Sequence, residues 1–286
     1  MQEMISLLKK EKVLLVTGLL GLLLGLFCQI YIMIFGATTG AEGNLSKAVS
    51  FNVSLGIFLI TTALIIGFAQ LSRRMLITFR WAYVVAALYS YGLETIQHLR
   101  GIDPRFTQIG SPIDSILAMI FGLVAFTMIG FYIVFASHFF KKNKLTEGRR
   151  GIIIAIRYGM LTTMLSFAAG IWISVLQSRF TGDTGNIIWL HGFGFHGLQF
   201  IPIIAWLLEQ QQKIHGRRLI HICGIVWTIA IISIAIQTLL GQSIFELSFI
   251  IGVAIFSFVV YVCIFIFLLI TVVKEKRHPP TITHEM

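Results

Sequence analysis

Glu94, Gln97 and His98 stand in an otherwise apolar stretch at positions i, i+3 and i+4. In a helix this spacing puts all three side chains on one face. An ionisable group inside a membrane costs about 2.5–3.5 kcal/mol at mid-helix on insertion scales, so its presence calls for a partner or a function. We expect this face to bind a proton or a solute. Arg100, in the loop that follows, is a further candidate because it would attract anions.

A second polar face is predicted around His191 and His196, which are followed by Gln199. At about 100° per residue, all three lie within one arc of about 140° on a helix. Nearby glycines would allow other helices to approach, and Pro202 would bend the helix. Polar faces on bent helices are typical of cavity walls in transporters.

Three interpretations of these residues remain open. The first is transport or binding of a small solute or ion, with Glu94 exchanging a proton. The second is a metal centre, either haem or zinc, held by His98, His191 and His196. The third is a purely structural role, with polar groups bonding across helices. HEXXH, CxxCH and phosphate-loop motifs are absent, so an enzyme is less favoured and the cofactor is left unassigned.

The composition predicts lipid as the medium that surrounds these residues. Of the 286 residues, 57% are hydrophobic and only 12% are charged, about half the charged share of soluble domains. The net charge is +10, and the Lys and Arg residues that produce it lie between long apolar runs rather than in a basic motif. It therefore indicates membrane topology and contact with anionic lipid, and we expect no nucleic-acid partner.

The apolar runs predict an all-α, polytopic transmembrane bundle of about eight helices. A span needs about 20 apolar residues to cross about 30 Å of hydrocarbon. The predicted spans are 13–35, 50–70, 81–98, 113–137, 152–176, 187–208, 219–240 and 247–273. Residues 274–286 are expected to form a short, polar cytoplasmic tail.

The distribution of Lys and Arg predicts the orientation. Each segment expected on the inner side carries at least three of these residues, and each segment expected outside carries at most two. This bias predicts that both termini are cytoplasmic. The predicted location is a bacterial cytoplasmic membrane.

We expect residues 1–286 to form a single transmembrane domain without an internal repeat. A duplication should make the third and seventh helices alike, whereas the polar helices are the third and the sixth. Since both polar faces are predicted near the outer surface, we expect them to enclose one outward-facing pocket, covered by the loop Arg100–Arg105. Oligomeric state is not predicted.

Overall fold

The computed structural model describes residues 8, 10–141, 149–211 and 216–277. The chain divides into two compact units, Met1–Lys141 and Lys142–Met286, and each is described by itself. The single transmembrane domain expected from the sequence therefore stays a prediction.

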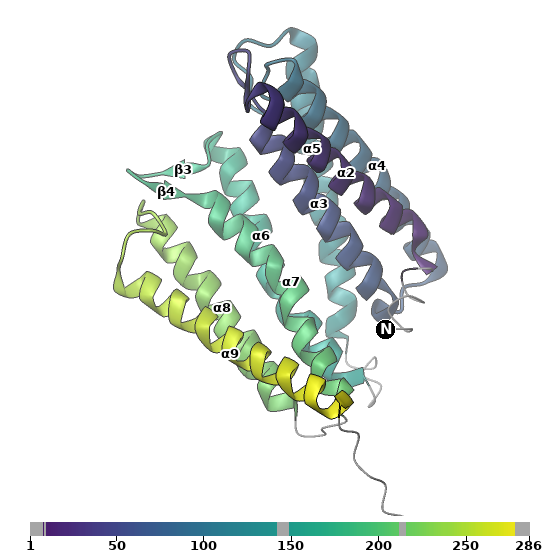
Figure 1. The fold of residues 1–286 in the computed structure, drawn as a ribbon. Coiled ribbons are helices and arrows are strands. Elements are labelled where there is room, and N and C mark those ends of the chain that lie inside the picture. Colours follow the sequence, from purple (N-terminus) through teal and green to yellow (C-terminus); the bar gives the residue numbers. More distant parts are fainter. Residues whose placement is uncertain (1–7, 9, 142–148, 212–215, 278–286) are drawn as a thin grey trace, which may run out of the picture. The chain divides into compact units, whose positions relative to one another are not determined.

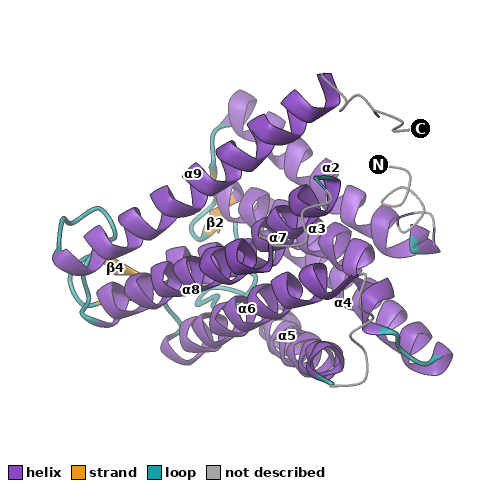
Figure 2. Ribbon diagram, turned by 90° about the horizontal axis from the view of Figure 1, so that it is seen from below, coloured by secondary structure: helices purple, strands orange, loops and turns teal. Residues whose placement is uncertain are grey.

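The described part of unit 1 contains four long helices, with a short hairpin between the first two (Figure 1). Its elements are α2 (Lys12–Phe35), β1 (Thr38–Thr39), β2 (Gly43–Asn44), α3 (Leu45–Ile65), the 3-10 turn η1 (Ile66–Ala69), α4 (Arg73–Leu99), α5 (Pro112–Ser137) and η2 (His138–Phe140). Unit 2 repeats this order with α6 (Arg150–Leu176), β3 (Phe180–Thr181), β4 (Gly185–Asn186), α7 (Ile187–Gln210), α8 (Arg217–Leu239) and α9 (Phe249–Arg277). Figure 2 shows that helix dominates the described chain.

The predicted all-α bundle is confirmed. The described residues form eight long helices, seven of which are long and apolar enough to cross a membrane. The exception is α4, which has 27 residues and thus sufficient length, but carries the polar groups singled out above. The protein is therefore a multi-pass membrane protein, and the membrane crossing of α4 stays a prediction.

Helix ends depart from the predicted spans where capping residues decide them. The second span begins earlier, at Leu45, because the Asn44 side chain accepts a hydrogen bond from the N–H of Ser46. The third begins at Arg73, where Ser72 is the N-cap. At the other end of the chain, α9 continues to Arg277, so the expected tail is partly helical and residues 278–286 lie outside the described chain.

The expectation that the chain has no internal repeat is wrong. Both units contain a helix, a two-stranded antiparallel hairpin and three further helices, in that order. The hairpins share their register, with Thr38 opposite Asn44 in unit 1 and Phe180 opposite Asn186 in unit 2. The third and seventh long helices, α4 and α8, hold the same place in the two units although only α4 carries a charged residue, Glu94, in its C-terminal half.

Two short sequence matches accompany this structural repeat. In the hairpins, TGAEGN (39–44) matches TGDTGN (181–186), and at the helix ends IQHLRG (96–101) matches IQTLLG (236–241). The matched segments touch in both units. Thr39 donates its hydroxyl to the carbonyl oxygen of His98, and Thr181 donates to that of Thr238.

Close packing of α2 on its neighbours fixes the position of α4. Gly21 is buried against the backbone of Asn52 in α3 and the ring of Tyr91 in α4, so any larger side chain would collide with both. Near the N-terminal end of α4, Arg80 makes a two-bonded ion pair with Glu11, at 2.8 and 2.9 Å. The C-terminal half of α4 is held by the contact of Tyr91 with Gly21 of α2.

Candidate functional site

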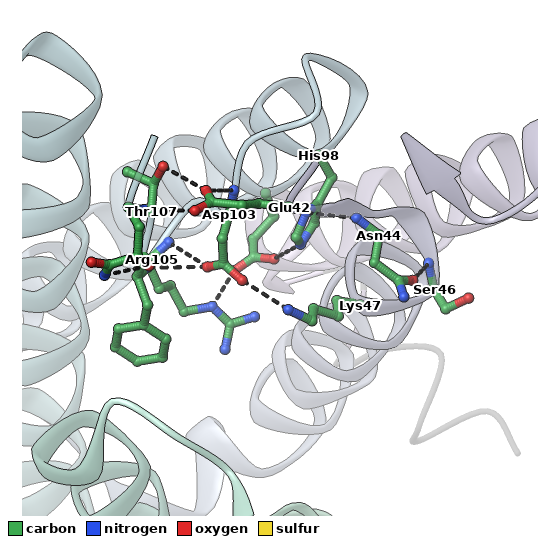
Figure 3. A network of polar contacts seen from close by, with 11 residues as sticks. Glu42, Asn44, Ser46, Lys47, His98, Asp103, Arg105 and Thr107 are labelled. Carbon is green, nitrogen blue, oxygen red and sulfur yellow. Dashed lines mark hydrogen bonds and ion pairs between the residues drawn. The ribbon is translucent and has the colours of Figure 1, made fainter. Parts of the chain in front are cut away.

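The candidate site of unit 1 lies where the β1–β2 hairpin and the loop 100–111 meet the end of α4 (Figure 3). Gly101 has a φ of +81° and Gly40 a φ of +55°, and their backbones touch. A Cβ on Gly40 would lie 2.8 Å from the Cα of Gly101. The left-handed backbone and the close approach both favour glycine. This contact seats the hairpin directly over the polar face of α4.

Glu94 is the most deeply buried charged group of this site. Its side chain is 0% exposed, and its Oε1 lies 2.7 Å from Nε of Arg105. Among the described residues, neither carboxylate oxygen receives a hydrogen bond of good geometry. A buried carboxylate usually has several such donors, so the charge of Glu94 depends mainly on one cation from the loop.

His98 faces Glu94 from the next turn of α4. Its Nε2 lies 3.5 Å from Oε2 of Glu94, and both side chains are fully buried. On the other side of the ring, the backbone N–H of Asn44 donates to Nδ1 at 3.3 Å. A nitrogen that accepts this bond carries no proton, so the ring proton of neutral His98 lies on Nε2 and points to Glu94.

Arg105 lies between the Glu94 carboxylate and two aromatic rings. Its Cζ is 5.6 Å from the ring centre of Phe51 in α3 and 5.7 Å from that of Phe121 in α5, distances suited to cation–π attraction. Burial by itself lowers the pKa of Arg105, but the charge of Glu94 outweighs it and holds this pKa above its ordinary value. The guanidinium therefore stays charged.

Two acidic residues hold the loop that carries Arg105. Asp103 pairs with Lys47 at 2.8 Å and accepts hydrogen bonds from the N–H groups of Arg105 and Phe106. Burial alone would raise the pKa of Asp103, but these bonds outweigh it and bring the pKa below its ordinary value.

The second acid of the loop is Glu42, in the hairpin. It accepts hydrogen bonds from the hydroxyl of Thr107 and the N–H of Gln108. Burial opposes the charge of this group too, yet the same bonds lower its pKa. The hairpin and the loop therefore form one bonded cap over α4.

Gln97 and Arg100 turn toward the start of α5 rather than toward Glu94. Both donate to Oδ1 of Asp114, at 2.8 and 2.6 Å. Asp114 in turn closes a capping box with Ser111 at the start of α5, one residue before the start of the predicted span 113–137. Arg100, expected from the sequence to attract anions, is thus paired with Asp114, and the cation beside Glu94 is Arg105. Arg105 follows Asp103–Pro104, a turn signal from which the chain reversal could have been predicted.

The candidate residues of unit 2 form two separate contacts. Nδ1 of His191 lies 2.7 Å from the carbonyl oxygen of Ser166, and Nδ1 of His196 lies 2.6 Å from Oε1 of Gln199. All three polar side chains are half-buried. Among the described residues, no group of three or more His, Cys, Asp or Glu side chains is placed to hold a metal ion. The convergence of this face with that of α4 stays a prediction.

The fold and the burial of polar groups define a multi-pass membrane protein with a charged site at one end of unit 1. Comparison with known protein families, with curated protein sequences and with solved structures finds no match.

Proposed function

We propose that the protein is a membrane carrier that couples the passage of a small solute to protonation of Glu94. The observation that carries this proposal is the comparison of the two units. Unit 2 builds the same hairpin, the same glycine contact and the same helix end as unit 1, with Ile234 in place of Glu94 and Thr238 in place of His98. The cap therefore folds without buried charge, and a structural role alone does not account for the charges of unit 1.

The same comparison separates Gln97 from the proposed proton site. Its counterpart Gln237 also bonds to the start of the following helix, where Ser248 donates to its Oε1 at 2.7 Å. Gln97 bonds to Asp114 at the start of α5. Since each glutamine bonds to the start of the following helix in its own unit, we interpret Gln97 as a structural residue of the cap. Arg100, which bonds to the same Asp114, is interpreted in the same way.

Protonation of Glu94 supplies the coupling step. A neutral carboxyl group loses its attraction for Arg105, and the loop then loses the ion pair that joins Arg105 to α4. Deeper along the same helices, the buried Tyr91 hydroxyl and Oδ1 of Asn52 have no hydrogen-bond partner among the described residues. Buried polar atoms normally have one, so water or a solute at this depth would complete them and extend the path inward.

The repeated architecture also favours a carrier. Many secondary transporters consist of two structural repeats. His191, His196 and Gln199 belong to this proposal as a second polar face that could continue the path. We place the protein in a bacterial cytoplasmic membrane, with the cap of unit 1 on the outer side, because the Lys and Arg distribution favours that orientation.

Proton uptake into liposomes tests the proposal. Purified protein is reconstituted with an internal pH dye, and a panel of organic acids, amino acids, sugars and amines is added outside at acidic pH. We expect at least one solute to drive proton entry, and Glu94→Gln to abolish it. Glu246→Gln is the matched control, because Glu246 is an exposed acid in the cap of unit 2. Absence of solute-driven proton entry across the panel, or unchanged entry in Glu94→Gln, would overturn the proposal.

A further inference from the structure

We infer that Arg105 is the group that binds the solute, and that the solute is an organic anion with an apolar body. This inference rests on the proposed carrier function and names the class of its substrate. The ion pair with Glu94 is made through Nε of Arg105. In Figure 3 the two Nη atoms lie on the far side of the guanidinium, away from any dashed line.

These Nη groups form an anion-binding edge. A guanidinium has five N–H donors in a planar fork, and the Nη edge matches a carboxylate or phosphate group in a two-bonded geometry. The Arg105 side chain is 29% exposed, whereas that of Glu94 is 0% exposed. An anion can therefore approach the guanidinium from outside while Glu94 holds it from inside.

The neighbouring cations of the cap are already neutralised by acids. Lys47 pairs with Asp103 at 2.8 Å, and Arg100 pairs with Asp114 at 2.6 Å. Both of these acids lie outside the buried face of α4. Arg105 differs because its ion-pair partner, Glu94, is a fully buried residue of α4. Under the proposed function, a proton on Glu94 removes this partner and leaves Arg105 with only the electrostatic attraction of Asp103, which already pairs with Lys47.

The apolar part of the solute is placed by two rings. Phe51 and Phe121 are half-buried, their ring centres are 5.7 Å apart, and Arg105 lies over both. An anion on the Nη edge would bring its apolar body against these rings. Unit 2 has a similar ring pair, Phe193 and Phe258 at 5.4 Å, but the loop that follows α8, QSIFELS (242–248), contains no arginine. The rings are thus common to both units and the arginine belongs to unit 1.

Binding of simple probes to the full-length protein in detergent micelles tests this inference without transport. Benzoate and hexanoate are the probes; acetate, inorganic phosphate, benzyl alcohol and benzylamine are the comparisons. We expect benzoate and hexanoate to raise the melting temperature in a saturable manner and the neutral and cationic aromatics to have no effect. Tighter binding of phosphate than of benzoate would assign the site to inorganic anions and overturn the apolar part of the inference.

Variants then assign the binding to Arg105. Arg105→Gln should weaken benzoate binding by about tenfold or more, since it removes a charged two-bonded contact. Arg179→Gln is the matched control, because Arg179 also lies over an aromatic ring, at 4.9 Å from that of Phe180, in the hairpin region of unit 2. Glu94→Gln should tighten benzoate binding because the competing carboxylate charge is removed. If Arg105→Gln is folded and binds benzoate as the parent protein does, the inference is wrong.

The two proposals fail in different ways. Benzoate binding that depends on Arg105, without solute-driven proton entry into liposomes, would refute the carrier function and leave the anion site in place. Proton-coupled entry of a sugar or an amine that is unaffected by Arg105→Gln would leave the carrier function in place and refute the anion site.

Discussion

The backbone N–H of Asn44 donates a hydrogen bond to Nδ1 of His98 at 3.3 Å, which joins the β1–β2 hairpin to the buried ring that faces Glu94. The ring can accept this bond only while Nδ1 is unprotonated. A second proton on His98 would be placed on Nδ1, where its N–H would repel the backbone N–H of Asn44. The state of the buried site and the seating of the hairpin are therefore linked through one side chain.

Two substitutions at His98 should separate its two contacts. His98→Asn puts an amide oxygen near the position of Nδ1 and should keep the hairpin seated, whereas His98→Gln places its polar group further out, toward Glu94. We expect hydrogen exchange in residues 38–44 to stay slow in His98→Asn and to rise in His98→Gln. Exchange is measured by mass spectrometry on the full-length protein. Equal exchange in the two variants would contradict the role of the Asn44 bond.

Removing the charge of Arg105 alone should lower the stability of the folded protein more than removing the charges of Arg105 and Glu94 together. Arg105→Leu leaves Glu94 buried without its cation, which typically costs about 3–5 kcal/mol. Glu94→Ile combined with Arg105→Leu imitates unit 2, where Ile234 takes the place of Glu94 and the loop after α8 has no arginine, so the double variant should recover most of the lost stability. Urea or thermal unfolding in micelles measures all three proteins. A double variant as unstable as Arg105→Leu would mean that the ion pair is needed for the fold.

Acid should loosen the cap through Asp103 and Glu42. Because the pKa of each is lowered in the folded protein, the unfolded cap binds more protons at low pH. The stabilisation is complete above the ordinary carboxyl pKa of about 4 and is lost as the pH falls through the lower folded values. We expect hydrogen exchange in residues 100–110 to rise below about pH 4. In the double variant Asp103→Asn and Glu42→Gln, exchange in residues 100–110 should be fast at every pH. If the double variant shows the same pH dependence as the parent protein, this account is wrong.

The glycine contacts should be equally sensitive in the two units. Gly101 and Gly241 have φ values of +81° and +72°, and each backbone touches the glycine of its hairpin. A side chain at positive φ costs about 1–2 kcal/mol, and the collision with the hairpin adds to it. Gly101→Ala and Gly241→Ala should therefore lower the melting temperature by similar amounts. Gly122→Ala, at a position with open space around it, is the control and should have little effect.

The composition and the long apolar runs were sufficient to predict helices in lipid, because length and hydropathy are properties of each segment alone. The capping of α5 by Ser111 and Asp114 was predictable for the same reason, since an N-cap is formed by neighbours in sequence. The polar face of Glu94 and His98 followed from helical spacing.

Only the tertiary structure decided which partner each polar group has. Glu94 and Arg105 are brought together by a turn that no periodicity encodes, and Arg100, which is nearer to Glu94 in sequence, pairs with Asp114 instead. The repeat was hidden for a related reason. The contacts between hairpin and helix end require glycine and threonine at fixed positions in both units. Lipid-facing positions require only that a side chain be apolar. The two units therefore share a fold with only short stretches of matching sequence.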